Sequence, residues 1–266
     1  MMRILLIGDI IGRKGREITA SILPGFKQEE KIDFCIANGE NLAGGFGITP
    51  AVAKEVYAAG VDVLTGGNHI WSKKEIYQII DEDERILRPL NYPPGVPGCG
   101  ARIYIVNNQR IGVISLCGRV FMDNLDCPFR TVRLEIEKMR AETQNIIVDF
   151  HAEATSEKVA MGLYLDGLVS AVIGTHTHVQ TADERVLPGG TAYITDTGMV
   201  GAKNSVIGAD SAVIIKRFLT SIPIKFEPTK TGPGIFCGVI IEIGSDTDSC
   251  STTANALSIR RVQCEV

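Results

Sequence analysis

The chain has 266 residues, of which 45% are hydrophobic and 22% are charged, and its formal net charge at pH 7 is −4. This length is enough to bury a sizeable core, and the composition is that of an ordinary globular protein. The small acidic excess excludes a broad basic surface for nucleic acid or anionic lipid, and no apolar run approaches the roughly 18–20 residues of a membrane span.

Seven cysteines are spread along the chain, and no two of them form a C-x-x-C pair. The odd number and the wide spacing argue against a disulfide framework or a zinc ribbon. Most of these cysteines have apolar neighbours, which is typical of small buried residues, and none is paired in sequence with a catalytic base. We therefore expect a protein of the reducing cytoplasm.

The predicted elements alternate between short apolar strands and amphipathic helices. The first run, residues 3–7 (RILLI), is almost wholly apolar, as in a strand buried on both faces. Thr49 and Pro50 are typical of a helix start, with the threonine as N-cap. Strands are predicted at residues 3–7, 33–37, 61–65, 102–106, 110–116, 146–150, 169–173, 192–195, 224–226, 239–243 and 257–262, and helices at 17–28, 50–59, 73–80, 131–143 and 156–165.

The order of these elements predicts an α/β fold. Strand–helix–strand units of this spacing pair in parallel with helices on the faces, while the hairpin at 102–116 and the tail strands add antiparallel pairs. We expect a two-layer α/β sandwich built on a mixed sheet. No linker divides the chain, so one domain over residues 1–266 is expected. A small cap within about residues 85–130, where prolines and glycines interrupt the pattern, is left open.

Polar residues that can bind a metal follow five of the predicted strands. They are Asp9 in IGD, Glu40 and Asn41 in NGEN, Asn68 and His69 in GGNH, His151 in DFHAE, and His176 and His178 in GTHTH. Ligands of open α/β sheets bind at the carboxyl ends of the strands. One such residue is usually structural or part of a turn, but five such segments together indicate a shared site.

The chemistry of this set favours metal ions. Imidazole nitrogens and carboxylate or amide oxygens are ligands for Mn, Fe and Zn, and alternate residues 176 and 178 point into the same space. Glu40 has the middle position of the set, from which its two oxygens can bridge two ions. Two ions about 3.5–4 Å apart activate a bridging hydroxide and neutralise a phosphoryl group during displacement.

The motifs IGD, NGEN, GGNH, a later single histidine and GTHTH, in this order, resemble the calcineurin-like metallophosphoesterases. The stretches DFHAEATSEK (149–158), GTHTHVQTAD (174–183) and ITDTGM (194–199) resemble more closely the YmdB-like bacterial phosphodiesterases, and the likeness runs over nearly the whole chain. The resemblance implies a calcineurin-like α/β sandwich with a mixed sheet core. It also implies a metal-dependent phosphoric diester hydrolase of the cyclic-nucleotide phosphodiesterase type.

The resemblance further implies a role for each residue of the set. One ion would be held by Asp9, Glu40, Asn41 and His178, and the other by Glu40 as bridge with Asn68, His151 and His176. His69 would stay off the metals, near the leaving group, as the general acid.

The sequence departs from the wider superfamily at two positions. Ile11 stands where the usual D-x-H motif has histidine, and the bridging position has Glu40 instead of aspartate. Both departures match the YmdB-like subgroup, in which the asparagine after the bridging glutamate fills the gap. A ligand set without thiolate leads us to expect two ions of Fe or Mn, with Zn as the alternative.

Small cyclic nucleotides, 2′,3′ or 3′,5′, are the substrates that the resemblance implies. A metal-bridging hydroxide would attack phosphorus while His69 protonates the departing ribose oxygen. Phe121, Phe129 and Arg119 are candidates for contacts with base and phosphate, although packing of a cap is the favoured interpretation of the two aromatic residues. The basic residues at 13, 14 and 16 are interpreted as a solvated helix start rather than a phosphate clamp.

Two further residues lie close to the motifs. Glu153 follows His151 by two residues and either orients a ligand imidazole or places negative charge in the first turn of the next helix. Trp71 closely follows GGNH and is interpreted as packing that loop against the core.

Two other functions are left open. One is a metal hydrolase acting on another class of ester, although HTHVQT lacks the Asp-His of the H-x-H-x-D-H motif. The other is a regulatory protein linked to RNA metabolism whose metals are structural, but the net negative charge argues against direct, tight nucleic-acid binding. As partners we expect a small phosphodiester such as a cyclic nucleotide and no membrane, and a homo-oligomer is left open.

Overall fold

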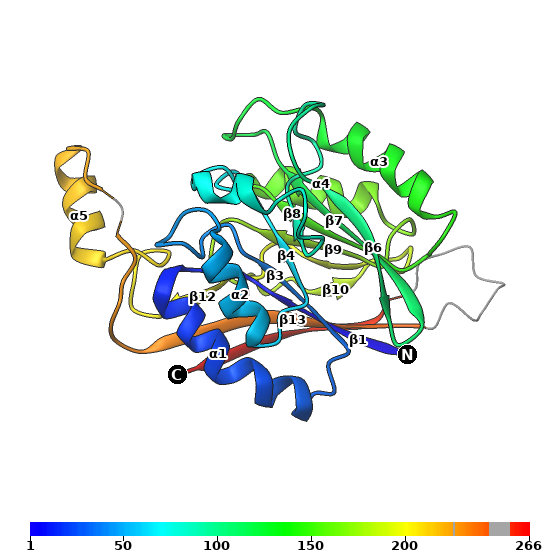
Figure 1. Cartoon of the computed structure of the whole chain (residues 1–266), viewed down its shortest axis with the longest axis horizontal. Coiled ribbons are helices and arrows are strands. Elements are labelled where there is room, and N and C mark those ends of the chain that lie inside the picture. The colour runs from blue at the N-terminus through cyan, green and yellow to red at the C-terminus, as the bar shows by residue number, and fades with distance from the viewer. Residues whose placement is uncertain (226, 245–255) are drawn as a thin grey trace.

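The computed structural model describes residues 1–225, 227–244 and 256–266. Within these ranges the strands form two sheets that stack face to face, and helices cover their outer faces (Figure 1). None of the helices in these ranges combines the length and the apolar character that crossing a bilayer requires.

The first sheet has eight strands among the described residues. Its order is β2-β12-β13-β1-β3-β4-β5, and β14 also pairs with β13. β1, β3, β4 and β5 run parallel, whereas β13 runs antiparallel to β1, β12 and β14. The bounds are β1 (Met2–Ile7), β2 (Asp9–Ile10), β3 (Phe34–Asn38), β4 (Val63–Thr65), β5 (Ile86–Leu87), β12 (Met199–Ala202), β13 (Gly234–Ile243) and β14 (Ala256–Glu265).

The second sheet has six strands in the described ranges, in the order β10-β11-β9-β8-β7-β6. The four central strands are parallel, and the edge strands β10 and β6 are antiparallel. The turn of the predicted β6–β7 hairpin places Asn107 and Asn108 at positive φ, which asparagine tolerates. The bounds are β6 (Ala101–Val106), β7 (Gln109–Cys117), β8 (Ile146–His151), β9 (Ala171–Thr175), β10 (Arg185–Val186) and β11 (Ala192–Ile194).

Three apolar layers hold the sheets and helices together. Between the sheets, residues such as Ile4 and Ile36 share a buried cluster with Val113 and Ile173. Outside the first sheet lie α1 (Gly12–Glu29), α2 (Pro50–Ala58) and the 3₁₀ helix η1 (Lys74–Gln78), and outside the second lie α3 (Pro128–Met139) and α4 (Thr155–Tyr164). In Figure 1, α5 (Ser211–Thr220) projects away from the body of the molecule.

The expected α/β sandwich with a mixed sheet core is confirmed, but the molecule has four layers and two sheets instead of two layers and one sheet. A continuous apolar run shows that both faces of a strand are buried, and it does not distinguish a covering helix from a second sheet. The region left open as a possible cap supplies β5, β6 and β7 to the two sheets. The organisation as one domain stays a prediction.

Most of the predicted elements are present with shifted ends. The helix expected at 17–28 begins at Gly12, and the one expected at 73–80 is a 3₁₀ helix. Thr49 caps α2 by accepting a hydrogen bond from the Val52 amide. Of the strand expected at 224–226, residues 224 and 225 are not in a strand and 226 lies outside the described residues. β12 and α5 are not among the elements predicted from the sequence.

Two glycine substitutions, which should change the free energy of unfolding in opposite directions, test the packing of this fold. In β9, a Cβ on Gly174 would lie 1.8 Å from the Thr195 carbonyl oxygen, so the adjacent chain would have to move. We expect Gly174→Ala to lower the free energy of unfolding in urea by about 1–3 kcal/mol or more. Gly25→Ala, in α1 with no atom within 4 Å of the added carbon, should raise it by about 0.5–1 kcal/mol. Equal stability of the two variants would contradict the close approach of Thr195 to β9.

Candidate metal centre

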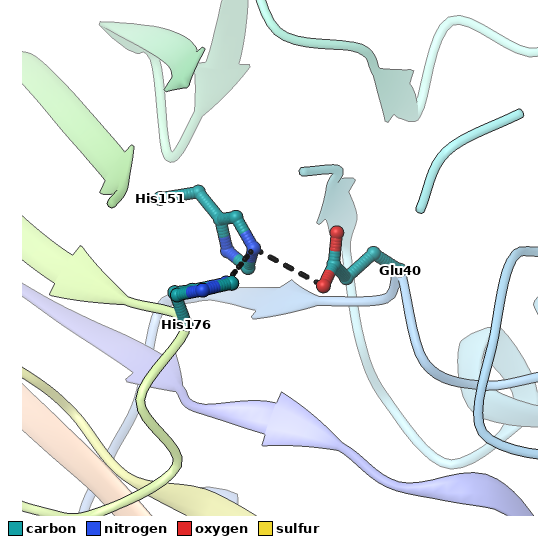
Figure 2. A group of neighbouring side chains, drawn as sticks. All are labelled: Glu40, His151 and His176. Carbon is teal, nitrogen blue, oxygen red and sulfur yellow. Dashed lines mark hydrogen bonds and ion pairs between the residues drawn. The ribbon is translucent and has the colours of Figure 1, made fainter. Parts of the chain in front are cut away.

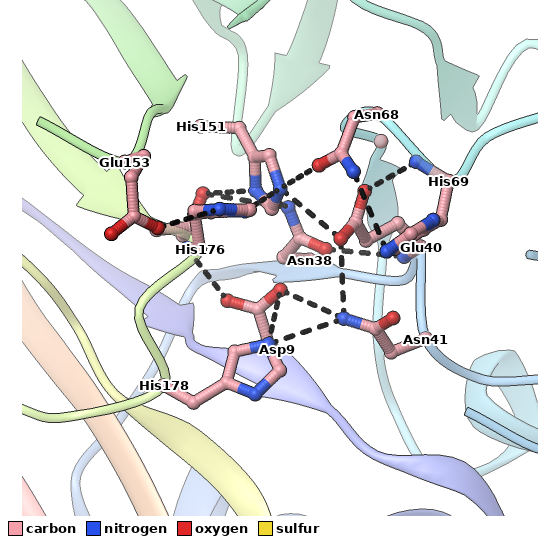
Figure 3. Close-up of polar contacts among 12 residues, drawn as sticks. Asp9, Asn38, Glu40, Asn41, Asn68, His69, His151, Glu153, His176 and His178 are labelled. Carbon is pink, nitrogen blue, oxygen red and sulfur yellow. Dashed lines mark hydrogen bonds and ion pairs between the residues drawn. The ribbon is translucent and has the colours of Figure 1, made fainter. Parts of the chain in front are cut away.

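The eight predicted site residues come together where the carboxyl ends of strands from both sheets meet. Asp9 follows β1, and the NGEN and GGNH segments follow β3 and β4 in the first sheet. His151 ends β8, and His176 follows β9 in the second sheet. Figure 3 shows their side chains pointing toward one another from these separate elements. The strand-end pattern in the sequence therefore located one cluster.

Glu40, His151 and His176 form the tightest group (Figure 2). Their candidate ligand atoms all lie within 4.8 Å of one another. His151 Nε2 is 3.1 Å from Glu40 Oε1 and 2.9 Å from His176 Nδ1. The amide oxygen of Asn68 is 3.0 Å from the same His151 nitrogen. This group has the four residues that the sequence assigned to one ion.

Asp9, Asn41 and His178 form an adjacent group. His178 Nε2 is 3.5 Å from Asp9 Oδ1, and the amide nitrogen of Asn41 is 3.2 Å from both Asp9 Oδ1 and Glu40 Oε1. The Glu40 carboxylate thus contacts both groups. An asparagine binds a cation through its oxygen, so Asn41 would fit as a ligand with its amide group turned over.

Two imidazoles of the cluster have one nitrogen facing inward and the other bonded to an outer acceptor. His176 Nε2 is 3.0 Å from Glu153 Oε2, and His178 Nδ1 donates to the Ile207 carbonyl over 2.8 Å. Histidines that bind metals are held in this way, because the outer hydrogen bond sets both the tautomer and the orientation of the ring. Of the two interpretations of Glu153, the contact with His176 supports the one in which it orients an imidazole.

The third imidazole is held through a hydroxyl group. Thr175 Oγ1 donates to the Asp149 carboxylate over 2.7 Å and lies 3.0 Å from His151 Nδ1, from which it can accept. This chain places the proton of neutral His151 on Nδ1 and leaves Nε2 free to face the cluster. Burial raises the pKa of Asp149 to about 6, against the effect of its hydrogen bonds.

The backbone of the GTHTH segment is strained. His176 has φ 107° and His178 has φ 66°, values that L residues other than glycine rarely adopt. Each such conformation costs on the order of 1–3 kcal/mol, and surrounding contacts must maintain it. The strained backbone directs both rings into the cluster.

The cluster is electrostatically suited to a cation. Burial raises the pKa of the Asp9 carboxyl, but the charge and hydrogen bond of His178, with smaller effects of other histidines, outweigh burial and leave the pKa well below its ordinary value. Burial likewise opposes ionisation of Glu40, and His151 outweighs it, so this pKa is also lowered. Two buried carboxylates therefore stay ionised side by side, which a cation would compensate.

The residues present fit divalent metal ions. Ionised carboxylates and an amide oxygen point into the cluster, together with imidazoles whose outer nitrogens are hydrogen-bonded. This donor set contains no thiolate. His69 is outside the tight group. Its main-chain amide donates to Glu40 Oε2 over 2.9 Å, and its ring contacts Phe46 edge-on at 4.7 Å.

A pocket of about 490 Å³ opens onto the cluster. It is lined by Ile11, Glu40, Asn41, Gly45, Phe46, His69, Glu153, His176, Thr177, His178, Ile207 and Arg217. Phe46 and Arg217 were not among the candidates for substrate contact predicted from the sequence. Phe46 lies between two noted motifs, but Arg217 lies on α5, where no sequence motif marked it.

The residues that the sequence offered for substrate contact do not line this pocket. Phe121 is 89% exposed, and Phe129 packs against Tyr164 with ring centroids 5.5 Å apart. The main-chain amide of Arg119 donates to Glu157. None of these three candidates contacts this pocket. Packing, the favoured interpretation of both aromatic residues, holds for Phe129 but is wrong for Phe121, whose ring is exposed.

The interpretation of the tryptophan is confirmed, and that of a solvated helix start holds for Arg13 but not for Arg16. Arg13 pairs with Glu17 on the exposed surface of α1, and Lys14 does not line the pocket. The Arg16 side chain is 13% exposed and donates to Glu55 and to the Leu42 carbonyl, so it is neither solvated nor facing the pocket. Trp71 stacks on Tyr77 and packs at the edge of the core.

Stacked mixed sheets with acids and imidazoles at the strand ends define a calcineurin-like metallophosphoesterase fold. The model of the family described as "YmdB-like protein" matches residues 5–256. The chain belongs to this family, as the motifs in the sequence implied.

Individual relatives agree with this assignment. The chain is 47% identical over 246 residues to a 2′,3′-cyclic-nucleotide 2′-phosphodiesterase of Bacillus subtilis (strain 168), and the match covers 92% of this chain and 93% of the relative. A crystal structure of a hypothetical protein from Thermus thermophilus superposes with a TM-score of 0.91 at 39% identity, over 99% of both chains. A crystal structure of a novel phosphatase from Mycoplasma pneumoniae gives 0.91 at 32% identity, over 99% of this chain and 93% of that one.

Protons should compete with metal at this site. Burial lowers the pKa of His178, but the adjacent Asp9 outweighs burial and raises that pKa to about 9, so the metal-free ring carries a proton at neutral pH. A histidine must be neutral to bind a metal, and Mn²⁺ binding should therefore release this proton and strengthen at least about tenfold per pH unit between pH 7 and 8.5. Titration calorimetry in two buffers of different ionisation enthalpy measures the release. His178→Gln should release one proton fewer, and an affinity independent of pH would contradict the assignment.

Proposed function

We propose that this protein is a dinuclear metal-dependent phosphodiesterase that hydrolyses small cyclic nucleotides, with 2′,3′-cyclic nucleotides as the first candidates. The single observation that carries the proposal is the Glu40 carboxylate, which contacts both groups of candidate ligands. The name of the Bacillus subtilis relative, 47% identical to this chain, supports the choice of a 2′,3′-cyclic ester.

In this proposal one ion is held by Asp9, Glu40, Asn41 and His178, and the second by Glu40, Asn68, His151 and His176. We infer iron or manganese, with zinc as the alternative, because the donors are oxygen and imidazole nitrogen. Two divalent ions held there would neutralise the phosphoryl oxygens and lower the pKa of a bound water. The protein's part is to keep the imidazoles neutral, oriented and pointing inward.

His69 is proposed as the general acid. Its amide bond to Glu40 fixes the backbone at the edge of the ligand cluster, and its ring lines the pocket beside Phe46. From there the imidazolium can give its proton to the ribose oxygen as the P–O bond breaks. In a cyclic ester that oxygen stays attached to the product, so protonation must precede its return to phosphorus.

The cellular setting that we propose is the cytoplasm. The six described cysteines are all free, in keeping with a reducing compartment. The proposed partner is a small phosphodiester, which the 490 Å³ pocket can accommodate.

Removal of the proposed acid should leave the metals in place. We expect His69→Ala to lower kcat for a cyclic nucleotide by about 10²–10⁴-fold, the usual contribution of general acid catalysis. Elemental analysis of the purified variant should give the metal content of the original protein. Loss of metal in this variant would contradict the role given to His69.

Removal of the proposed bridge should have a different signature. Outer partners of metal ligands already contribute about 10–100-fold to metal affinity, so Glu40→Ala should lose at least this much affinity and nearly all turnover. Metal content and kcat are measured on the same preparation, with His69→Ala as the matched variant. A Glu40→Ala protein with both ions and normal turnover would refute the bridge.

The activity itself is tested with a substrate panel. We expect hydrolysis of bis-p-nitrophenyl phosphate and of 2′,3′-cyclic nucleotides that a chelator abolishes and Mn²⁺ restores. The panel includes 3′,5′-cyclic nucleotides, linear diesters and a carboxylic ester as controls. Activity that resists the chelator, or faster turnover of the carboxylic ester, would overturn the proposed function.

A further inference from the structure

Two residues of the family motifs have no part in the ligand cluster described above. Lys158 ends DFHAEATSEK, and Asp196 lies within ITDTGM. Their side chains are 1% and 0% exposed, and Lys158 Nζ lies 2.6 Å from Asp196 Oδ2. A fully buried ion pair thus joins α4 to the segment that follows β11.

Both partners of this pair also bind the backbone of the GTHTH segment. Lys158 Nζ donates to the Thr175 carbonyl over 2.7 Å, and Asp196 Oδ2 accepts from the Thr177 amide over 3.0 Å. Asp196 Oδ1 accepts from the Gly198 amide, which ties the carboxylate to its own loop. The ion pair therefore holds the residue before His176 and the residue after it.

These two backbone bonds act on a segment with a strained backbone. His176 and His178 both have positive φ, so the segment requires external contacts to keep its shape. Desolvation offsets much of the attraction within a buried ion pair, so such a pair adds little net stability compared with apolar side chains. Its distinctive contribution here is to fix a donor, Lys158, at the residue before His176 and an acceptor, Asp196, at the residue after it.

We propose that Lys158 and Asp196 form a positioning clamp that holds His176 and His178 in the conformation that binds metal. The inference rests on the proposed metal site, to which it adds two positioning residues outside the set of ligands. Without the clamp, the segment would relax toward ordinary backbone angles, and the two imidazoles would no longer point into the cluster together.

The test uses Lys158→Met/Asp196→Asn, which removes both charges and leaves neither ion alone. The control is Lys27→Met/Asp62→Asn, which removes an ion pair whose side chains are 21% and 38% exposed. Lys27 Nζ likewise donates to a carbonyl, that of Gly60, and to Asp62, whose carboxylate accepts from the Cys35 amide. This pair has the same pattern of bonds but lies between α1 and the first sheet, where none of its residues belongs to the ligand cluster.

Two readouts are taken on full-length, metal-free protein. Hydrogen exchange of the Thr177 amide, followed by NMR, should be at least about tenfold faster in the clamp variant, because its acceptor is lost or weakened. The affinity for Mn²⁺, measured by calorimetry, should fall by about 10–100-fold. The control variant should change neither the exchange rate of the Thr177 amide nor the affinity for Mn²⁺. This should hold even if its melting temperature falls as much as that of the clamp variant.

Each result decides a separate point. Unchanged exchange of Thr177, or faster exchange with unchanged affinity for Mn²⁺, would overturn the clamp. If the original protein itself binds no Mn²⁺, the proposed function fails, and exchange at Thr177 still decides whether the pair holds the segment. Where circular dichroism shows the double variant unfolded, Asp196→Asn alone is read by the same criteria.

Discussion

The burial of Asp9 and Glu40 beside each other is the constraint on which the site depends. Both carboxylates are at most 1% exposed, and both stay ionised because histidines surround them. Burying an ionised carboxylate is costly unless opposite charge is close at hand. The stacking of two sheets makes this arrangement accessible, because histidines from the second sheet meet acids from the first at a common edge.

Orientation of the imidazoles depends on outer partners that are not themselves candidate ligands. His151 is set by the Thr175 hydroxyl and Asp149, His176 by Glu153, and His178 by a main-chain carbonyl in the turn before α5. These outer partners come from β8 and β9, the segment before α4 and the turn after β12. A large part of the fold therefore acts on the geometry of three rings.

The sequence predicted the candidate cluster better than it predicted the architecture around it. Strand ends are visible in sequence because apolar runs stop abruptly at Gly, Asp, Asn or His, and parallel strands bring such ends to one edge. By contrast, a run such as residues 3–7 carries no information on whether a helix or a sheet covers each face. The pocket wall was missed for a related reason. Phe46 and Arg217 lie in a loop and on a projecting helix, where neither strand ends nor metal chemistry marks them.

The segment between β12 and α5 contributes both to the candidate metal centre and to the wall of the pocket. The Ile207 carbonyl accepts from His178, Ile207 also lines the pocket, and ten residues later Arg217 of α5 lines it as well. Ile207 itself has φ 49°, a further strained residue beside the candidate ligands. The strained residues 176, 178 and 207 thus all lie among or beside the candidate metal ligands. Packed sheets and buried polar bonds elsewhere must offset this strain, and this is why the conformation of the site follows from the whole fold and not from the local sequence of GTHTH.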